Sequence, residues 1–275
     1  MFNSSLTESC LTYFSFYLLK HGIDHGRIWW CPSGTLNYLP IHAAASLDNK
    51  YIQSYTTTLE ALINGRKHHE SLASAGLVKV SAIGIAKIKD FPALDLPLVE
   101  EEIEQIHIAT KMQEFNQVLD SEATVSHVLE VIKSAQWLHL ACHGQQHFTA
   151  PLKSSIILSD GHLELGQVLE SSLPAAEFVF LSACQTAMGN ARLMNEALHL
   201  AGGFIAAGFP AAIGTLWNIA DADGPLVSKI VYQRLFSEGK PDVTDSAEAL
   251  HLAVQSLRKQ GVPFQRWMPF IHMGI

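Results

Sequence analysis

The sequence has few charged residues and no cluster of basic ones. Only 16% of its 275 residues are charged, and 18 lysines and arginines stand against 26 aspartates and glutamates, a net charge of −8. Sequence-independent binding to a phosphate backbone needs clustered positive charge, so this composition excludes that class of function and predicts no nucleic-acid partner. With 48% hydrophobic residues the chain is too apolar for a disordered protein, and we expect a folded domain.

Long hydrophobic runs and paired cysteines are also missing. No apolar stretch reaches the roughly 18 residues that a membrane span needs. The N-terminus lacks the basic start and small-residue cleavage site of a signal peptide. The four cysteines, Cys10, Cys31, Cys142 and Cys184, form no CxxC pair, and we interpret them all as thiols. These absences predict a cytoplasmic protein without a membrane partner.

Short apolar runs alternate along the chain with longer stretches of helical period. The runs expected to form strands are Arg27–Cys31, Val78–Ile85, Gln136–Cys142, Ser155–Leu158, Glu177–Ala183 and Ala211–Trp217. The stretches expected to form helices are Leu98–Met112, Thr124–Ser134, Leu193–Gly208, Pro225–Ser237 and Ser246–Gln260. Such alternation favours an α/β fold whose mostly parallel sheet is covered by helices on both faces. For the last helix we expect Asp245 as the N-cap, Glu248 completing a capping box, and Gly261 as the stop.

Two of the expected strands end in residues that are capable of chemistry. The run Gln136–Cys142 is followed by His143 and Gly144, and the run Glu177–Ala183 by Cys184. Functional groups in such folds lie just beyond the carboxyl ends of the strands. A cysteine nucleophile needs a nearby base and backbone N–H donors for the oxyanion, which the N–H groups of Gly144 and Cys184 would supply. The alternative is that neither residue is catalytic, with the cysteine a small core residue and the histidine a loop residue.

The motifs around these residues resemble a known family. HLACHG, at the end of the first strand, and LSACQTAMG, at the end of the second, resemble the CHAT family, caspase-like cysteine peptidases often fused to TPR repeats. The resemblance extends to GFPAAIGTLWNIADAD at 208–223, LPLVEEEIEQI at 96–106 and WWCPSGTLNYLPIHAA at 29–44, and the N-terminal part looks closest to fungal versions. The expected organisation is an N-terminal extension over residues 1–24 and a CHAT domain over 25–275. Within that domain, residues 25–95 would form an N-terminal subdomain and 96–275 the catalytic part, divided near the proline-containing segment FPALDLP.

The resemblance implies a fold, an activity and roles for single residues. The fold would be a caspase-like three-layer α/β/α sandwich with a central, mostly parallel sheet. His143 would be the general base and Cys184 the nucleophile of a cysteine endopeptidase that needs no metal or organic cofactor. In separases, an aspartate after the strand ending in LW binds a basic residue before the scissile bond. Asp221 or Asp223 takes that place here, and the sequence alone does not distinguish them.

The partners implied are a protein or peptide substrate and a TPR-containing or other regulatory protein. Two other functions are compatible with the sequence. One is a caspase-like scaffold or regulatory module that no longer cleaves, and the other is a small-molecule hydrolase or acyltransferase with the same dyad. An extended groove beside an open strand edge would favour a peptidase, and a closed pocket a small-molecule enzyme.

A zinc site is the remaining alternative at this place in the chain. His139, His143 and His147 are spaced by four residues. On a strand, however, His139 would belong to the sheet core, and the turn at Gly144 would break the register. Because no HExxH or CxxC motif accompanies the three histidines, we do not expect them to bind zinc.

Overall fold

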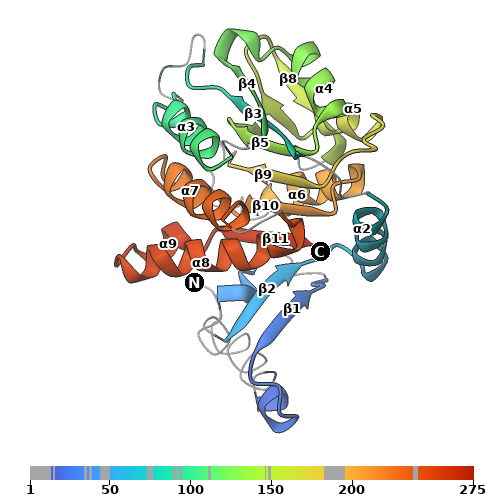
Figure 1. Ribbon diagram of the computed structural model, residues 1–275, viewed down its shortest axis with the longest axis vertical. Coiled ribbons are helices and arrows are strands. Elements are labelled where there is room, and N and C mark those ends of the chain that lie inside the picture. Colours follow the sequence, from blue (N-terminus) through green and yellow to red (C-terminus); the bar gives the residue numbers. More distant parts are fainter. Residues whose placement is uncertain are drawn as a thin grey trace.

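A central sheet flanked by helices on both faces forms the body of the molecule (Figure 1). The computed structural model describes residues 14, 16–33, 36, 39–43, 50–72, 77–88, 92, 95–110, 113–145, 147, 150–182, 196–237 and 241–275. The central sheet has eight strands, in the spatial order β1 (Gly26–Trp30), β2 (Tyr51–Tyr55), β11 (Phe270–Gly274), β10 (Ala211–Thr215), β9 (Phe178–Leu181), β5 (Trp137–Ala141), β3 (Lys79–Gly84) and β4 (Glu114–Leu119). Only β10 and β11 run antiparallel, so the expected mostly parallel sheet is confirmed.

The two faces of the sheet carry separate hydrophobic cores. The described helices are α2 (Leu59–Ser71), α3 (Val99–Ala109), α4 (Val125–Ser134), α5 (Leu165–Leu169), α6 (Glu196–Ala207), α7 (Asp223–Leu235), α8 (Ser246–Lys259) and α9 (Phe264–Trp267). One core packs residues of α4, α5 and α6 against the sheet, and the other packs residues of α3, α7 and α8. Side chains of strand β5 contribute to both cores, because successive residues of a strand point to opposite faces of the sheet. Trp137 belongs to the second core, and Leu138 and Leu140 belong to the first.

A small antiparallel sheet follows β5 directly. It consists of β6 (Gly144–Gln145), β7 (Ser155–Ile157) and β8 (His162–Glu164). The expected strand Ser155–Leu158 therefore exists, but it lies in this second sheet. Because only two residues, Cys142 and His143, separate the end of β5 from the start of β6, the small sheet fixes the backbone around His143.

Three strands of the central sheet are additional to those expected from the sequence. They are β2, β4 and β11. Strand β4 is an edge strand with half of its residues exposed, all three of them polar, and β11 is a short C-terminal run inserted between β10 and β2. The last helix has Asp245 at its N-cap position, as expected, but the Asp245 side chain makes no capping hydrogen bond there. A 3-10 turn at Val243–Asp245 precedes the helix, and the Asp242 side chain caps that turn.

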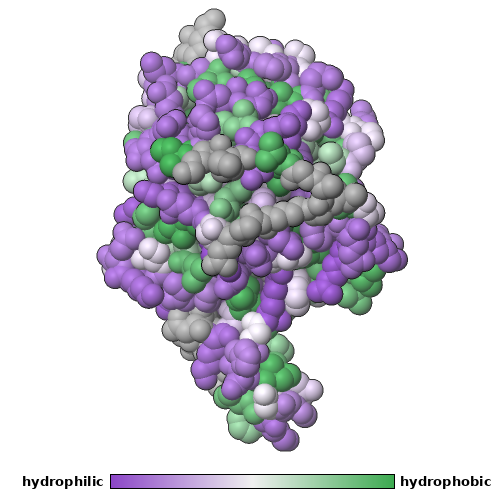
Figure 2. All heavy atoms as spheres, viewed as in Figure 1, coloured by the Kyte–Doolittle hydropathy of each residue, from purple (hydrophilic) through white to green (hydrophobic). Residues whose placement is uncertain are grey.

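The surface is predominantly hydrophilic on the face shown in Figure 2, where hydrophobic residues form small separate patches. Large exposed hydrophobic side chains do occur at the N-terminal end, where Phe16 is 65% and Tyr17 56% exposed. Among the described residues, no helix is both long enough and apolar enough to cross a membrane.

A partly buried histidine joins the N-terminal part of the chain to its C-terminal part. His42 Nδ1 lies 2.8 Å from the Tyr55 hydroxyl, and its Nε2 lies 2.9 Å from the carbonyl oxygen of Met268. This geometry fits a neutral ring that donates from Nε2 and accepts at Nδ1. Burial lowers the pKa of His42 to about 4, and the Met268 carbonyl opposes that shift.

This histidine makes stability depend on pH in a defined direction. The unfolded chain protonates His42 near pH 6.5, whereas the folded protein resists protonation down to about pH 4. The free energy of unfolding should therefore fall as the pH drops from 6.5 to 4, with at most about 3 kcal/mol lost through this residue. Urea unfolding of wild type and His42→Gln across this range measures it, with the exposed His21→Gln as control. A wild-type curve that is flat over the range, or an undiminished slope in His42→Gln, would contradict the assignment.

Candidate active site

His143 lies at the carboxyl edge of the central sheet, where the sequence places it. Strands β5 and β9 are parallel neighbours, and their last pair is Leu140 with Leu181. His143 follows β5 by two residues and is only 8% exposed. Its carbonyl oxygen accepts a 2.8 Å hydrogen bond from the backbone N–H of Ile157, in the small sheet. The imidazole is therefore carried by a backbone that two sheets hold in place.

Of the two proposed oxyanion-hole residues, the structure describes Gly144 but not Cys184. Gly144 is buried and begins β6, where it pairs with Ile156. Cys184, the expected nucleophile, lies outside the described residues, as do the other residues of 183–195. On this side of the site the description ends at Ser182, which is 8% exposed. The structure thus gives the histidine side of the expected dyad and the strand that leads to the cysteine.

A small polar cavity lies beside these strand ends. Its walls come from the ends of β5 and β9, from the first turns of α3 and α7, and from the loop after β10. Asp221, Glu102 and Ser182 are its polar lining residues, and Ala141 and Gly224 are among the small ones. Its volume of about 30 Å³ is close to that of one water molecule in the liquid. The cavity therefore brings two carboxylates and a hydroxyl group together in a small, partly open space.

Asp221 connects this cavity electrostatically to His143. Its Oδ2 accepts a 3.2 Å hydrogen bond from the backbone N–H of Leu98, at the start of α3. Burial is the main cause that raises the pKa of Asp221, and the nearby Glu102 charge raises it further. The Leu98 N–H and the charge of His143 act in the opposite direction. His143 therefore lies within electrostatic range of the Asp221 carboxylate.

Asp223, the other candidate, is already paired. It is the first residue of α7 and is 1% exposed. Arg266 of α9 binds it with two hydrogen bonds, Nε to Oδ2 at 2.9 Å and Nη2 to Oδ1 at 2.6 Å. This bidentate pair raises the pKa of Arg266, through the hydrogen bonds first and the charge second. Both oxygens of Asp223 are thus used in joining α7 to α9.

Glu102 is a site residue that the sequence analysis missed. It is 4% exposed, accepts a short hydrogen bond from the Ser228 hydroxyl, and lies 3.2 Å from His139 Nε2 without the alignment of a hydrogen bond. Gly224 explains how α7 comes so close: a Cβ there would lie 2.8 Å from Glu102 Oε2 and 3.1 Å from Ser182 Oγ. The sequence shows three successive glutamates at the start of α3, where negative charge favours the positive end of the helix dipole. Only the third of them shares a helix face with Val99, Ile103 and Ile106, and that periodicity was the available clue.

The three histidines of the zinc alternative lie in different surroundings. His139 is fully buried in the sheet core, as expected, and contacts Glu102, Phe180 and Tyr232. His147 Nδ1 accepts a hydrogen bond from the backbone N–H of Ala150. Within the part of the chain that the structure describes, no group of three or more His, Cys, Asp or Glu residues could hold a metal ion.

Comparisons with known proteins agree on the fold. Residues 8–275 match a family model described as the CHAT domain, and no curated protein sequence matches the chain. A chain of the Saccharomyces cerevisiae separase–securin complex superposes with a TM-score of 0.61 at 12% identity, over 90% of this protein and 15% of that chain. The RgpB pro- and mature-domain complex from Porphyromonas gingivalis gives a TM-score of 0.63 at 11% identity, over 96% of this protein and 67% of that chain. A further match is the Arg-specific cysteine proteinase gingipain R, with a TM-score of 0.61 at 10% identity over 96% of this protein and 66% of that chain.

These structural similarities concern the fold of the protein. The fold is caspase-like, with a central mostly parallel sheet flanked by helices, and it is related to the folds of separase and gingipain. The protein spans only about 15% of the length of the chain matched in the separase–securin complex.

Proposed function

The protein belongs to the CHAT domain family, and from this premise we propose that it is a cysteine endopeptidase with His143 as general base and Cys184 as nucleophile. The observation that carries the proposal is the register of two neighbouring strands. Every pair between β5 and β9 joins residues 41 positions apart, from Trp137 with Phe178 to Leu140 with Leu181. His143 and Cys184 are separated by the same 41 positions (184 − 143). A continuation of the register by three residues would bring the imidazole and the thiol together.

The proposed reaction needs only groups of this chain and a water molecule. His143 accepts the thiol proton, and the thiolate of Cys184 attacks the carbonyl carbon of the scissile peptide bond. The backbone N–H groups of Gly144 and Cys184 stabilise the oxyanion. His143 then protonates the leaving amine as the C–N bond breaks, and the new amino end departs. Water, deprotonated by His143, hydrolyses the remaining thioester, which releases the acid and restores the thiol.

A preference for a basic residue before the scissile bond is the proposed specificity, with Asp221 as its determinant. The cavity beside His143 contains the carboxylates of Asp221 and Glu102, and this negative potential favours a substrate cation. Asp223 is the weaker candidate, because Arg266 already engages both of its oxygens. With room for about one water molecule, the cavity must widen to admit a guanidinium or ammonium group.

The biological setting is also part of the proposal. The resemblance to the CHAT family supports a protein or peptide substrate, regulation by a TPR-containing or other protein partner, and a fungal-type sequence.

Cleavage of a diverse peptide library by the purified protein tests the proposed function. The expected result is a set of cut sites that share one residue before the scissile bond, with no cleavage by Cys184→Ala under the same conditions. Cys31→Ala, which removes an exposed thiol elsewhere on the surface, is the matched control and should cleave normally. Cleavage that persists in Cys184→Ala would disprove the nucleophile. A wild type that cleaves no peptide, with or without candidate regulatory partners, would favour the non-cleaving scaffold.

A further inference from the structure

A second cavity lies at the far end of the sheet from His143. It has a volume of about 250 Å³ and is bordered by Arg27 and Trp29 of the edge strand β1, Arg66 of α2, and Thr244 of the turn before α8. Nothing in the proposed peptidase mechanism uses these residues. The cavity is large enough for a phosphate group with a small organic group attached.

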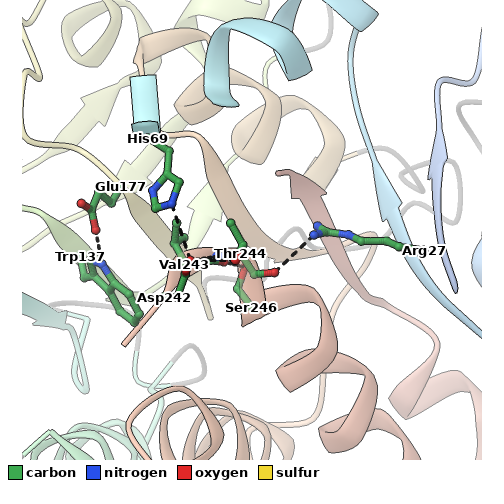
Figure 3. A network of polar contacts seen from close by, with 8 residues as sticks. All are labelled: Arg27, His69, Trp137, Glu177, Asp242, Val243, Thr244 and Ser246. Carbon is green, nitrogen blue, oxygen red and sulfur yellow. Dashed lines mark hydrogen bonds and ion pairs between the residues drawn. The ribbon is translucent and has the colours of Figure 1, made fainter. Parts of the chain in front are cut away.

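Arg27 is held in a fixed position at this cavity. Its Nε and Nη2 donate to the Ser54 hydroxyl at 3.1 and 3.0 Å, and its Nη1 donates to the carbonyl oxygen of Thr244 at 3.3 Å. Figure 3 shows the guanidinium reaching toward Thr244. Its Nη2 also lies 3.3 Å from His272 Nδ1. The guanidinium is therefore ordered before any ligand arrives, which lowers the entropy cost of binding.

The histidine behind Arg27 reinforces this arrangement. Burial, and secondarily the charge of Arg27, hold the pKa of His272 well below its usual value, so the ring is neutral. Its Nε2 lies 2.8 Å from the Ser246 hydroxyl, which donates to the carbonyl oxygen of Val243. Nε2 must therefore carry the proton, which leaves Nδ1 to accept from Arg27 or Ser54.

The second arginine brings uncompensated positive charge close to the first. The guanidinium carbons of Arg27 and Arg66 lie 4.6 and 5.2 Å from the centre of the Trp29 ring. Burial lowers the pKa of Arg27 to about 10, and the neighbouring charge of Arg66 contributes to the shift. Two guanidinium groups are thus gathered around one aromatic ring at a cost in electrostatic energy. An anion bound between them would relieve that repulsion.

The acidic groups nearby do not neutralise these arginines. Glu70 borders the cavity one helical turn beyond Arg66, and Asp242 lies close by. Asp242 is occupied by other partners, because it accepts hydrogen bonds from the N–H and hydroxyl of Thr244 and lies 3.6 Å from His69 Nε2 (Figure 3). Among the described residues, no carboxylate, that of Glu70 included, forms an ion pair with Arg27 or Arg66.

We propose that this cavity binds the phosphate group of a small phosphate monoester, held between the guanidinium groups of Arg27 and Arg66 with Trp29 as an aromatic wall. A phosphate dianion matches two arginines in charge, and its oxygens match the planar N–H fork of Arg66. Arg27 contributes mainly its charge, because its Nε and Nη2 already donate to the Ser54 hydroxyl. A single carboxylate would leave one of the two positive charges unbalanced.

Calorimetric titration of the purified protein with inorganic phosphate, O-phosphoserine and glutarate tests this proposal. Saturable binding of both phosphate compounds is expected, with glutarate binding more weakly. Arg66→Gln should weaken phosphate binding at least tenfold, because it removes one of the charge-assisted contacts from an exposed position that tolerates the change. Lys67→Gln is the matched control, since it removes the same charge from the neighbouring exposed position outside the cavity and should bind as wild type.

The outcomes separate clearly. No saturable binding of either phosphate compound, equal weakening by Arg66→Gln and Lys67→Gln, or tighter binding of glutarate than of phosphate would each overturn the proposal. Unfolding temperatures of the two variants, measured in parallel, show whether a loss of binding reflects a loss of folding. Since no peptide is cleaved in this experiment, its result is independent of the proposed peptidase activity.

Discussion

Replacement of His143 by alanine is expected to lower kcat for peptide cleavage by at least about 10³-fold, with a much smaller effect on KM. In the proposed mechanism the imidazole takes the thiol proton, protonates the leaving amine and activates the water, so every chemical step would depend on it. It would touch the reacting atoms rather than the remote parts of the substrate, and for that reason KM should change little. His143 is 8% exposed at the junction of two sheets, so its unfolding temperature must be measured beside the rates.

The matched control for this variant is His107→Ala. His107 is in the last turn of α3, and its side chain is 52% exposed. Alanine there removes an imidazole without affecting the carboxyl edge of the sheet, so the rates should stay within about twofold of wild type. Equal losses in both variants, or a folded His143→Ala protein that cleaves at the wild-type rate, would refute the role of His143 as general base.

Replacement of Asp221 by asparagine should remove the preference for arginine or lysine before the scissile bond. We expect kcat/KM for such substrates to fall by about 10²-fold, which is the size of one charge-assisted contact in an enclosed site. Substrates with neutral residues at this position should be affected far less. Asparagine keeps the shape of the side chain and an oxygen that can accept from the Leu98 N–H. The change therefore tests the charge and leaves the local packing in place.

Asp223→Asn is the informative comparison. It weakens the pair with Arg266, so it should lower stability by about 1 to 2 kcal/mol while the preference for basic residues remains. The pH dependence adds a second measurement. Burial raises the pKa of Asp221, so kcat/KM for basic substrates should decline as the pH falls toward a pKa higher than the ordinary value of 3.8. A specificity change in Asp223→Asn but not in Asp221→Asn would reverse the assignment.

The parts of the fold that could be predicted are those that depend on local pattern. Strands β5 and β9 are uncharged runs buried on both sides, and their sequences indicate that they are strands. Strand β4 could not be predicted in this way, because edge strands are half exposed and carry polar residues. Strand β11 owes its place to long-range pairing with β10 and β2, which a local pattern does not encode.

In the candidate site, too, some features follow from the local sequence and others depend on contacts between distant segments. His143 and its position at a strand end follow from the motif and the strand that precedes it. The distinction between Asp221 and Asp223 depends on Arg266, which lies 43 residues beyond Asp223 and comes close only through the packing of α9 on α7. Glu102 is on a helix remote in sequence from the strands it meets. Such contacts between distant segments require the folded chain.

The rate at which a peptidyl chloromethyl ketone alkylates Cys184 tests the central claim most directly. Mass spectrometry locates the modified cysteine in wild type and in His143→Ala, and the exposed thiol of Cys31 serves as an internal reference in the same molecule. If His143 activates Cys184, the wild type should be modified at Cys184 about 100-fold faster than at Cys31, and His143→Ala should lose that advantage. Equal modification of the two cysteines in wild type, or a fast reaction of Cys184 that persists in His143→Ala, would contradict the His143–Cys184 dyad.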